Sequence, residues 1–132
     1  MADVHPAGLK TDTDKQAERA ARKLLGLCPS MEAVLVKRGA KGSLLVSGDP
    51  DGFVLLQPAV KAKSVVDTTG AGDCFTAAFA IALLAATARP DSDPESAHAE
   101  AMKFAATAAA ICVQRQGAMP SMPSRQEVEQ LL

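Results

Sequence analysis

Aromatic residues are almost missing from this sequence, which contains no tryptophan, no tyrosine and only four phenylalanines among 132 residues. Aromatic rings are the usual stacking platforms of proteins that bind single-stranded nucleic acids. An excess of positive charge is missing too, because 14 basic residues are balanced by 15 acidic ones. Without that excess there is no bulk attraction to nucleic acid or to anionic lipid. The sequence therefore predicts no nucleic-acid partner and no membrane partner, and its core has to be aliphatic.

Long apolar runs are absent as well. The longest uncharged run, residues 74–88, is diluted by alanine and threonine and is short for a membrane helix of about 20 apolar residues. The first ten residues have no apolar stretch behind a basic flank, so no secretory signal is predicted. Metal-ligand spacing is also lacking, which predicts no zinc site and three reduced thiols in a reducing compartment. The residues concerned are Cys28, Cys74, Cys112, His5 and His98.

The composition that remains is that of a folded chain. Apolar residues make up 48% and charged residues 22%, which excludes general disorder, and the length suits one domain or a piece of a larger one. Apolar spacing predicts a first helix over 13–27, which Gly26 and Pro29 end. Helices and strands alternate at first and helices then dominate, which indicates an α/β fold. The other expected elements are strands over 33–36, 43–47 and 53–56, and helices over 73–87, 93–114 and 124–132, the last opened by a capping box.

The segment Asp67–Asp73 is the sharpest feature, because two glycines and an alanine precede a long helix. Backbone N–H groups at such a helix start form a site for an anion such as phosphate. A carboxylate there, Asp73, could accept a proton from a hydroxyl group that attacks the phosphate. Helix capping is the alternative, and it explains Asp73 taken alone better than catalysis does. Neither a P-loop nor a dinucleotide fingerprint fits, because Phe75 stands where the fingerprint needs a small residue.

Taken as a whole, this segment resembles the signature of the ribokinase-like sugar kinases, the PfkB family. Two other segments support the resemblance. Val36–Ser43 looks like the family's nucleotide-contacting turn, and Gln114–Pro123 is similar to the carboxy-terminal loop of the ribokinase group. The residues at 75–80 and 119–123 look most like plant or algal members. The resemblance covers residues 9–132 and implies a three-layer α/β/α sandwich, of which residues 1–132 are the carboxy-terminal part.

The resemblance also implies roles for individual residues. Asp73 would be the general base and would hold the sugar hydroxyl group, while Gly70, Ala71 and Gly72 would offer N–H groups to the γ-phosphate of ATP. A tight turn between two strands explains the glycines of 37–42 equally well. Ala106 stands where some relatives have a polar residue near the adenine. The expected nucleotide-binding residues are Lys37, Arg38, Gly39, Ala40, Lys41, Gly42, Gly72, Asp73 and Ala106.

Metal ions are implied in the same way. Members of the family use Mg²⁺ with ATP, and ribokinases hold a monovalent cation, usually K⁺, beside the anion site. Most of its ligands are backbone carbonyl groups, so the side chains need not look like a metal site. Taken alone, Arg115 is more often a solvated cation at a helix end, and Cys112 is more often part of the core. The matching positions are Asp67, Thr69, Cys112, Arg115, Gly117 and Ser121.

Length is the main departure from the family, whose members are more than twice as long. Their sugar pocket lies mostly in the amino-terminal half, and nothing before Leu9 resembles the family's Asn-x-x-x-Glu-like motif. We therefore expect a truncated carboxy-terminal part, inactive alone, whose parallel sheet has lost its central strands. A homodimer is the expectation for the full-length protein, in the cytoplasm or, for a plant or alga, in the plastid.

Three functions remain open at this point. The first is ATP-dependent phosphorylation of D-ribose to D-ribose 5-phosphate. The second is phosphorylation of another sugar, such as fructose, or of a nucleoside by a different member of the family. The third is a module without catalytic activity that binds a nucleotide or a partner chain.

Overall fold

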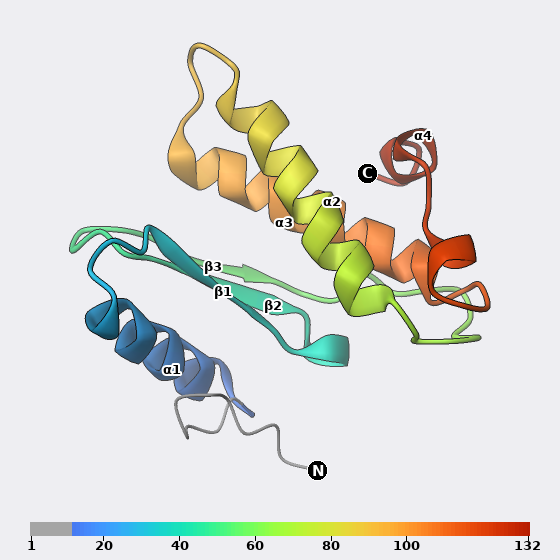
Figure 1. Ribbon diagram of the computed structural model, residues 1–132, viewed down its shortest axis with the longest axis horizontal. Coiled ribbons are helices and arrows are strands. Elements are labelled where there is room, and N and C mark those ends of the chain that lie inside the picture. Colours follow the sequence, from blue (N-terminus) through green and yellow to red (C-terminus); the bar gives the residue numbers. More distant parts are fainter. Residues whose placement is uncertain (1–11) are drawn as a thin grey trace. The chain divides into compact units, whose positions relative to one another are not determined.

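The computed structural model describes residues 12–132, which divide into two compact units at residues 56 and 57 (Figure 1). The first unit contains α1 (Asp14–Leu27), β1 (Ala33–Lys37), β2 (Ser43–Ser47) and most of β3 (Val54–Gln57). The second contains α2 (Ala71–Thr87), α3 (Pro94–Cys112) and α4 (Arg125–Glu129). Two short 3₁₀ helices, η1 (Gly39–Lys41) and η2 (Met119–Ser121), form where only a turn and a loop are predicted.

Helix α1 begins with a capping box, which the apolar spacing of 13–27 does not reveal. The Gln16 N–H donates to Thr13 Oγ1 at 3.2 Å, and the Thr13 N–H donates to Gln16 Oε1 at 3.0 Å. These bonds satisfy two N–H groups at the helix start. The predicted end at Leu27 is confirmed, but Gly26 lies inside the helix and the C-cap is Cys28. The Cys28 N–H reaches the carbonyl groups of both Leu24 and Leu25 at 3.2 Å.

The three strands form one sheet in the order β1-β2-β3, and β1 pairs with β2 in antiparallel register. Val36 lies opposite Leu44, and Val34 lies opposite Val46. The parallel sheet that the resemblance implies is therefore not what these strands form. The reason is the short connection of residues 38–42, since parallel neighbours need a crossover of about a dozen residues or more.

The core of the first unit lies between α1 and one face of β1 and β2. Ala17 and Ala21 of α1 are fully buried, and their small side chains let the helix backbone approach the sheet closely. Figure 1 shows α1 running along this sheet. The apolar residues of the strands that complete this cluster are Val34, Val36, Leu44 and Val46.

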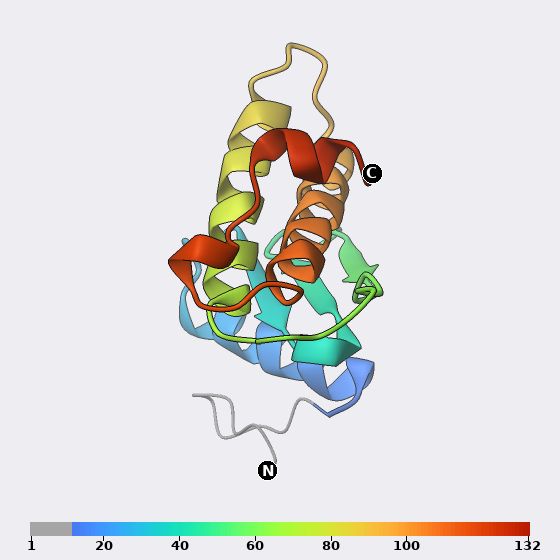
Figure 2. The ribbon, with the colours of Figure 1, turned by 90° about the vertical axis from the view of Figure 1, so that its right-hand side faces the viewer.

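In the second unit, α2 and α3 lie side by side and are joined by a short loop (Figure 2). Helix α3 starts where the sequence predicts it, and Asp93 is its N-cap, accepting the Ser96 N–H at 2.8 Å, with Pro94 as the first helical residue. Ser124 and Glu127 form the predicted capping box of α4, but α4 ends at Glu129 rather than Leu132. Within residues 12–132, none of the helices combines the length and apolar character that crossing a bilayer requires.

Candidate active site

Two distant segments of the second unit meet at Asp67. The N–H groups of Val66 and Asp67 donate to the Val113 carbonyl at 2.8 and 3.2 Å. The Asp67 carboxylate then accepts two backbone bonds at 2.9 Å, one from the Thr69 N–H and one from the Gly117 N–H. The loop that precedes α2 is thereby tied to the loop that follows α3.

The hydrogen bonds at Asp67 also fix its charge. The Thr69 side chain, the Thr69 N–H and the Gly117 N–H all lower the pKa of this carboxyl group below its ordinary value, against the opposing effect of burial. Hydrogen bonds that favour the charged form have this effect generally. Asp67 is therefore a carboxylate at neutral pH, and the two loops meet around a negative charge.

Gly70 starts α2 in a conformation that suits glycine. It is the N-cap, with φ 81° and ψ −7°, and no side chain caps the helix there. A Cβ atom at this position would lie 3.0 Å from Ala118 Cα and 3.1 Å from Ala118 Cβ. Gly70 thus supplies both the left-handed turn and the close approach to the second loop. Helix α2 begins at Ala71, two residues before the predicted start.

The amino terminus of α2 is the predicted anion site. The first N–H groups of a helix have no partner within the helix and lie at the positive end of the helix dipole. The Ala71 N–H makes a long bond to the Thr68 carbonyl at 3.2 Å. Asp73 is the third residue of the helix and is exposed, so the N-cap role belongs to Gly70 rather than to Asp73. The carboxylate of Asp73 therefore lies on the same turn as the three predicted amides.

The second loop is held by buried polar contacts around Ser121. Ser121 is buried, and its hydroxyl group donates to the Ala118 carbonyl at 2.6 Å. Cys112, which is 0% exposed, has its Sγ 3.1 Å from Ser121 Oγ. The Arg115 N–H donates to the Cys112 carbonyl at 3.1 Å. These contacts make residues 112–121 a compact turn.

Of the six residues predicted to hold a monovalent cation, Asp67 and Thr69 lie in the loop before α2. Cys112 ends α3, and Arg115, Gly117 and Ser121 follow it. In the described part of the chain, no hydrogen bond uses the carbonyl oxygen of Arg115 or Gly117 as its acceptor. Asp67 adds a negative charge next to them, and oxygen atoms are the ligands that K⁺ prefers. The Ser121 hydroxyl group and the Cys112 carbonyl group are already engaged. Among the predicted residues that follow α3, the carbonyl groups of Arg115 and Gly117 are therefore the ones that accept no hydrogen bond in the described part of the chain.

A second carboxylate, Glu127 of α4, contacts the same loop. It forms an ion pair with Arg115 and also accepts the N–H and hydroxyl group of Ser124 at 2.7 and 3.0 Å. The Arg115 hydrogen bond, followed by those from Ser124, lowers the pKa of Glu127 to about 2. The sequence predicts only the capping box that Glu127 completes, because no local pattern links Glu127 to Arg115.

The other predicted nucleotide-contacting residues lie elsewhere in the fold. The turn of residues 37–42 belongs to the first unit, where Arg38 is 7% exposed and donates to Asp14 Oδ1 at 2.6 Å. Lys41 Nζ donates to the Asp12 carbonyl at 3.1 Å, so both side chains tie this turn to the start of α1. Gly39 and Gly42 have φ 57° and 83°. Ala106 lies within α3 and is 7% exposed.

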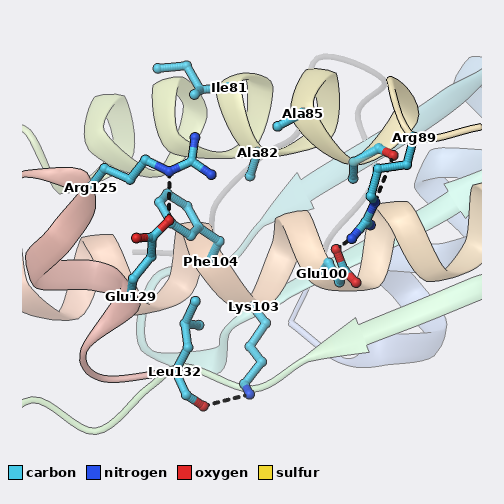
Figure 3. Close-up of a pocket in the computed structure, with 11 residues that line it drawn as sticks. Ile81, Ala82, Ala85, Arg89, Glu100, Lys103, Phe104, Arg125, Glu129 and Leu132 are labelled. Atoms are coloured by element: carbon cyan, nitrogen blue, oxygen red, sulfur yellow. Dashed lines mark hydrogen bonds and ion pairs between the residues drawn. The ribbon is translucent and has the colours of Figure 1, made fainter. Parts of the chain in front are cut away.

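A groove of the second unit is separate from this site. It has a volume of about 410 Å³ and lies between α2, α3 and α4 (Figure 3). Two ion pairs line it, Arg89 with Glu100 at 2.6 Å and Arg125 with Glu129 at 2.7 Å. None of the predicted site residues lines this groove. The candidate site is instead the exposed start of α2 and the two loops joined by Asp67.

Cys74, next to Asp73, is a buried thiol. Burial, and then the neighbouring Cys112, raise the pKa of Cys74 to about 11 from the ordinary value of 9.0. At pH 8 the thiolate fraction of Cys74 is about 100-fold smaller than that of a thiol with the ordinary pKa. Alkylation of native Cys74 should therefore be at least about 100-fold slower than alkylation of such a thiol. Half-buried Cys28 should react first with iodoacetamide. Peptide mass spectrometry after timed labelling measures the order, and equal labelling of Cys28 and Cys74 in the folded protein would contradict it.

A glycine turn at the start of a long helix, with a carboxylate on the first helical turn, can form a phosphate site. The family model of the pfkB family of carbohydrate kinases matches residues 5–125. The chain belongs to this family, and the resemblance seen in the sequence is confirmed.

Among its relatives, the chain is 44% identical to ribokinase of Arabidopsis thaliana over 126 residues, which are 95% of this chain and 30% of that protein. It is 38% identical to fructokinase-1 of Zea mays, covering 79% of the chain and 30% of that protein. The structure of Arabidopsis thaliana ribokinase complexed with ribose and ATP matches with a TM-score of 0.78 and 42% identity, covering 95% of this chain and 36% of that one. Giardia lamblia ribokinase matches with a TM-score of 0.80 and 32% identity, covering 91% and 38%. These matches confirm the predicted ribokinase-like fold, and the chain spans about a third of the length of its relatives.

Proposed function

We propose that this chain is the carboxy-terminal part of a kinase that transfers the γ-phosphate of ATP to D-ribose, giving D-ribose 5-phosphate. The observation that carries the proposal is the Gly70 turn at the start of α2, which places Asp73 on the same helical turn as the amides of Gly70, Ala71 and Gly72. The similarity to ribokinases over 95% of the chain favours ribose as the acceptor.

Asp73 acts as the general base in this proposal. Its carboxylate accepts the proton of the sugar's primary hydroxyl group as that oxygen bonds to the γ-phosphorus of ATP. The bond from the γ-phosphorus to the bridging oxygen of ADP breaks, and ADP leaves. The N–H groups of Gly70, Ala71 and Gly72, with the dipole of α2, stabilise the charge on the transferred phosphoryl group.

ATP and its metal ions place further demands on the chain. We assign the nucleotide to the turn of residues 37–42, where Gly39 and Gly42 allow close approach of the backbone. No three His, Cys, Asp or Glu side chains of residues 12–132 come together as a metal site. Mg²⁺ therefore enters the proposal only as an ion carried by ATP. A K⁺ ion at the carbonyl groups of Arg115 and Gly117 would strengthen the positive field at the phosphate.

A second acceptor is the specific alternative. The chain is 38% identical to a Zea mays fructokinase, and a structure of Salmonella enterica aminoimidazole riboside kinase matches with 31% identity and a TM-score of 0.59. The sugar-contacting residues of the family lie mostly outside the third of the fold that this chain spans. Fructose and nucleosides are therefore the competing substrates.

The test begins with the native polypeptide that contains residues 67–73, whose mass is measured first. That polypeptide is then assayed for ADP release with D-ribose, D-fructose and adenosine in K⁺ buffer. We expect the highest kcat/KM with D-ribose and no phosphorylation by residues 1–132 alone. Faster turnover of fructose or adenosine would replace ribose as the substrate, and nucleotide binding without turnover of any of the three would indicate a binding module.

A further inference from the structure

The ion pair between Arg115 and Glu127 connects α4 to the loop after α3. This loop contains the carbonyl groups of Arg115 and Gly117, the predicted cation ligands. Arg115 follows the end of α3, and Glu127 is the third residue of α4. Glu127 is itself held by two hydrogen bonds from Ser124, at 2.7 and 3.0 Å. Ser124 therefore restrains the Glu127 carboxylate independently of Arg115, and the carboxylate can restrain the Arg115 side chain in turn.

The same loop is held on its other side by Asp67. The Gly117 N–H, two residues after Arg115, donates to Asp67 Oδ2 at 2.9 Å. Two carboxylates from distant parts of the chain thus bind residues 115–117. Glu127 binds the Arg115 side chain, and Asp67 accepts the Gly117 backbone N–H. A peptide segment fixed at both ends keeps its carbonyl groups in a defined direction, which is what coordination of a cation requires.

We propose that Glu127 is a positioning residue that, through Arg115, orients the carbonyl groups of Arg115 and Gly117 for a monovalent cation. The inference rests on the proposed kinase function and deepens it, because the cation serves that same site. Glu127 itself contacts neither the phosphate site at Gly70–Gly72 nor Asp73 in the described hydrogen bonds. Its role is to hold the loop.

A matched control lies two residues further along α4. Glu129 forms an ion pair with Arg125 at 2.7 Å within the same helix, and neither residue contacts the loop of residues 112–121 in the described ion pairs and hydrogen bonds. Glu129→Gln therefore removes the same charge from the same helix and leaves the loop untouched. A property that changes in Glu127→Gln but not in Glu129→Gln therefore depends on the ion pair between Glu127 and Arg115.

The experiment compares the full-length enzyme with its Glu127→Gln and Glu129→Gln variants in two measurements. The first is the K⁺ concentration that gives half-maximal activity. We expect it to rise about two- to fivefold in Glu127→Gln, as the loss of a partly exposed ion pair implies, with kcat at saturating K⁺ within about twofold of the unsubstituted enzyme. The second is amide hydrogen exchange of residues 113–121 without substrates, which should become faster in Glu127→Gln and slower again when K⁺ is added. Glu129→Gln should match the unchanged enzyme in both.

Each outcome decides the inference. An unchanged K⁺ requirement in Glu127→Gln overturns it, as does a loss of kcat that saturating K⁺ does not restore, since a merely structural ion pair would give that loss. The inference is also overturned if the enzyme without substitutions is active and its activity does not depend on K⁺. Absence of any sugar phosphorylation refutes the proposed function instead. The exchange measurement then still decides, because K⁺-dependent protection of residues 113–121 that Glu127→Gln weakens would support the positioning role without activity.

Discussion

Replacing Asp73 by asparagine, D73N, is expected to lower kcat for sugar phosphorylation about 10²–10⁴-fold, the usual contribution of a general base. Asparagine has nearly the same shape but cannot accept the proton of the attacking hydroxyl group. Asp73 is exposed at the third position of α2 and is not its N-cap, so the fold does not depend on its carboxylate. The dissociation constant for ATP should therefore stay within a few-fold of its original value.

Asp93 provides the matched control for D73N. It also lies at the start of a long helix, where its carboxylate accepts the Ser96 N–H at 2.8 Å. Asparagine and aspartate are about equal as N-caps, so D93N should leave both the folding and the activity of the enzyme nearly unchanged. Steady-state kinetics, calorimetric titration with ATP and thermal unfolding separate the two roles. If D73N loses stability but keeps its kcat, Asp73 serves the helix and not the reaction.

The order of elements in the fold is predictable because local rules govern it. The apolar spacing of 13–27, the Asp93-Pro94 start and the capping box at Ser124 each act within a few residues, and all three appear where the sequence places them. The errors are local as well. Gly26 continues α1 instead of ending it, because the cap bonds come from Cys28, and Gly70 starts α2 two residues early by adopting a left-handed conformation.

The contacts that assemble the candidate site are beyond such rules. Asp67 and Gly117 are 50 residues apart in sequence, and Arg115 and Glu127 are on either side of η2. No periodicity relates these residues, because each bond depends on where the chain returns after a helix hairpin. The resemblance to the PfkB family predicts Asp67 and Gly117 as cation-site residues, but it does not predict the hydrogen bond between them. The pairing of Glu127 with Arg115 came only from the structure.

Gly70→Ala is the second change with a large expected effect. A side chain at φ 81° costs about 1–2 kcal/mol, and the new Cβ atom would lie 3.0–3.1 Å from the backbone and side chain of Ala118. To make room, the start of α2 and the second loop must move apart by a few tenths of an ångström. Since small misplacements at a reacting centre can cost about 10²-fold in rate, we expect kcat/KM to fall by about that factor.

Gly70→Ala should also lower stability, for two reasons: the left-handed conformation and the close contact with Ala118. Gly117→Ala separates these two contributions. Gly117 has a similar φ of 85°, but its nearest neighbour to a new Cβ atom is Pro120 Cδ at 3.5 Å, an ordinary contact. Chemical denaturation should therefore show the conformational cost of about 1–2 kcal/mol in Gly117→Ala and a larger loss in Gly70→Ala. The difference between the two variants is the free energy of the close approach between Gly70 and Ala118. If the two variants lose the same stability, the left-handed conformation alone explains Gly70, and the contact of the loops does not constrain the phosphate site.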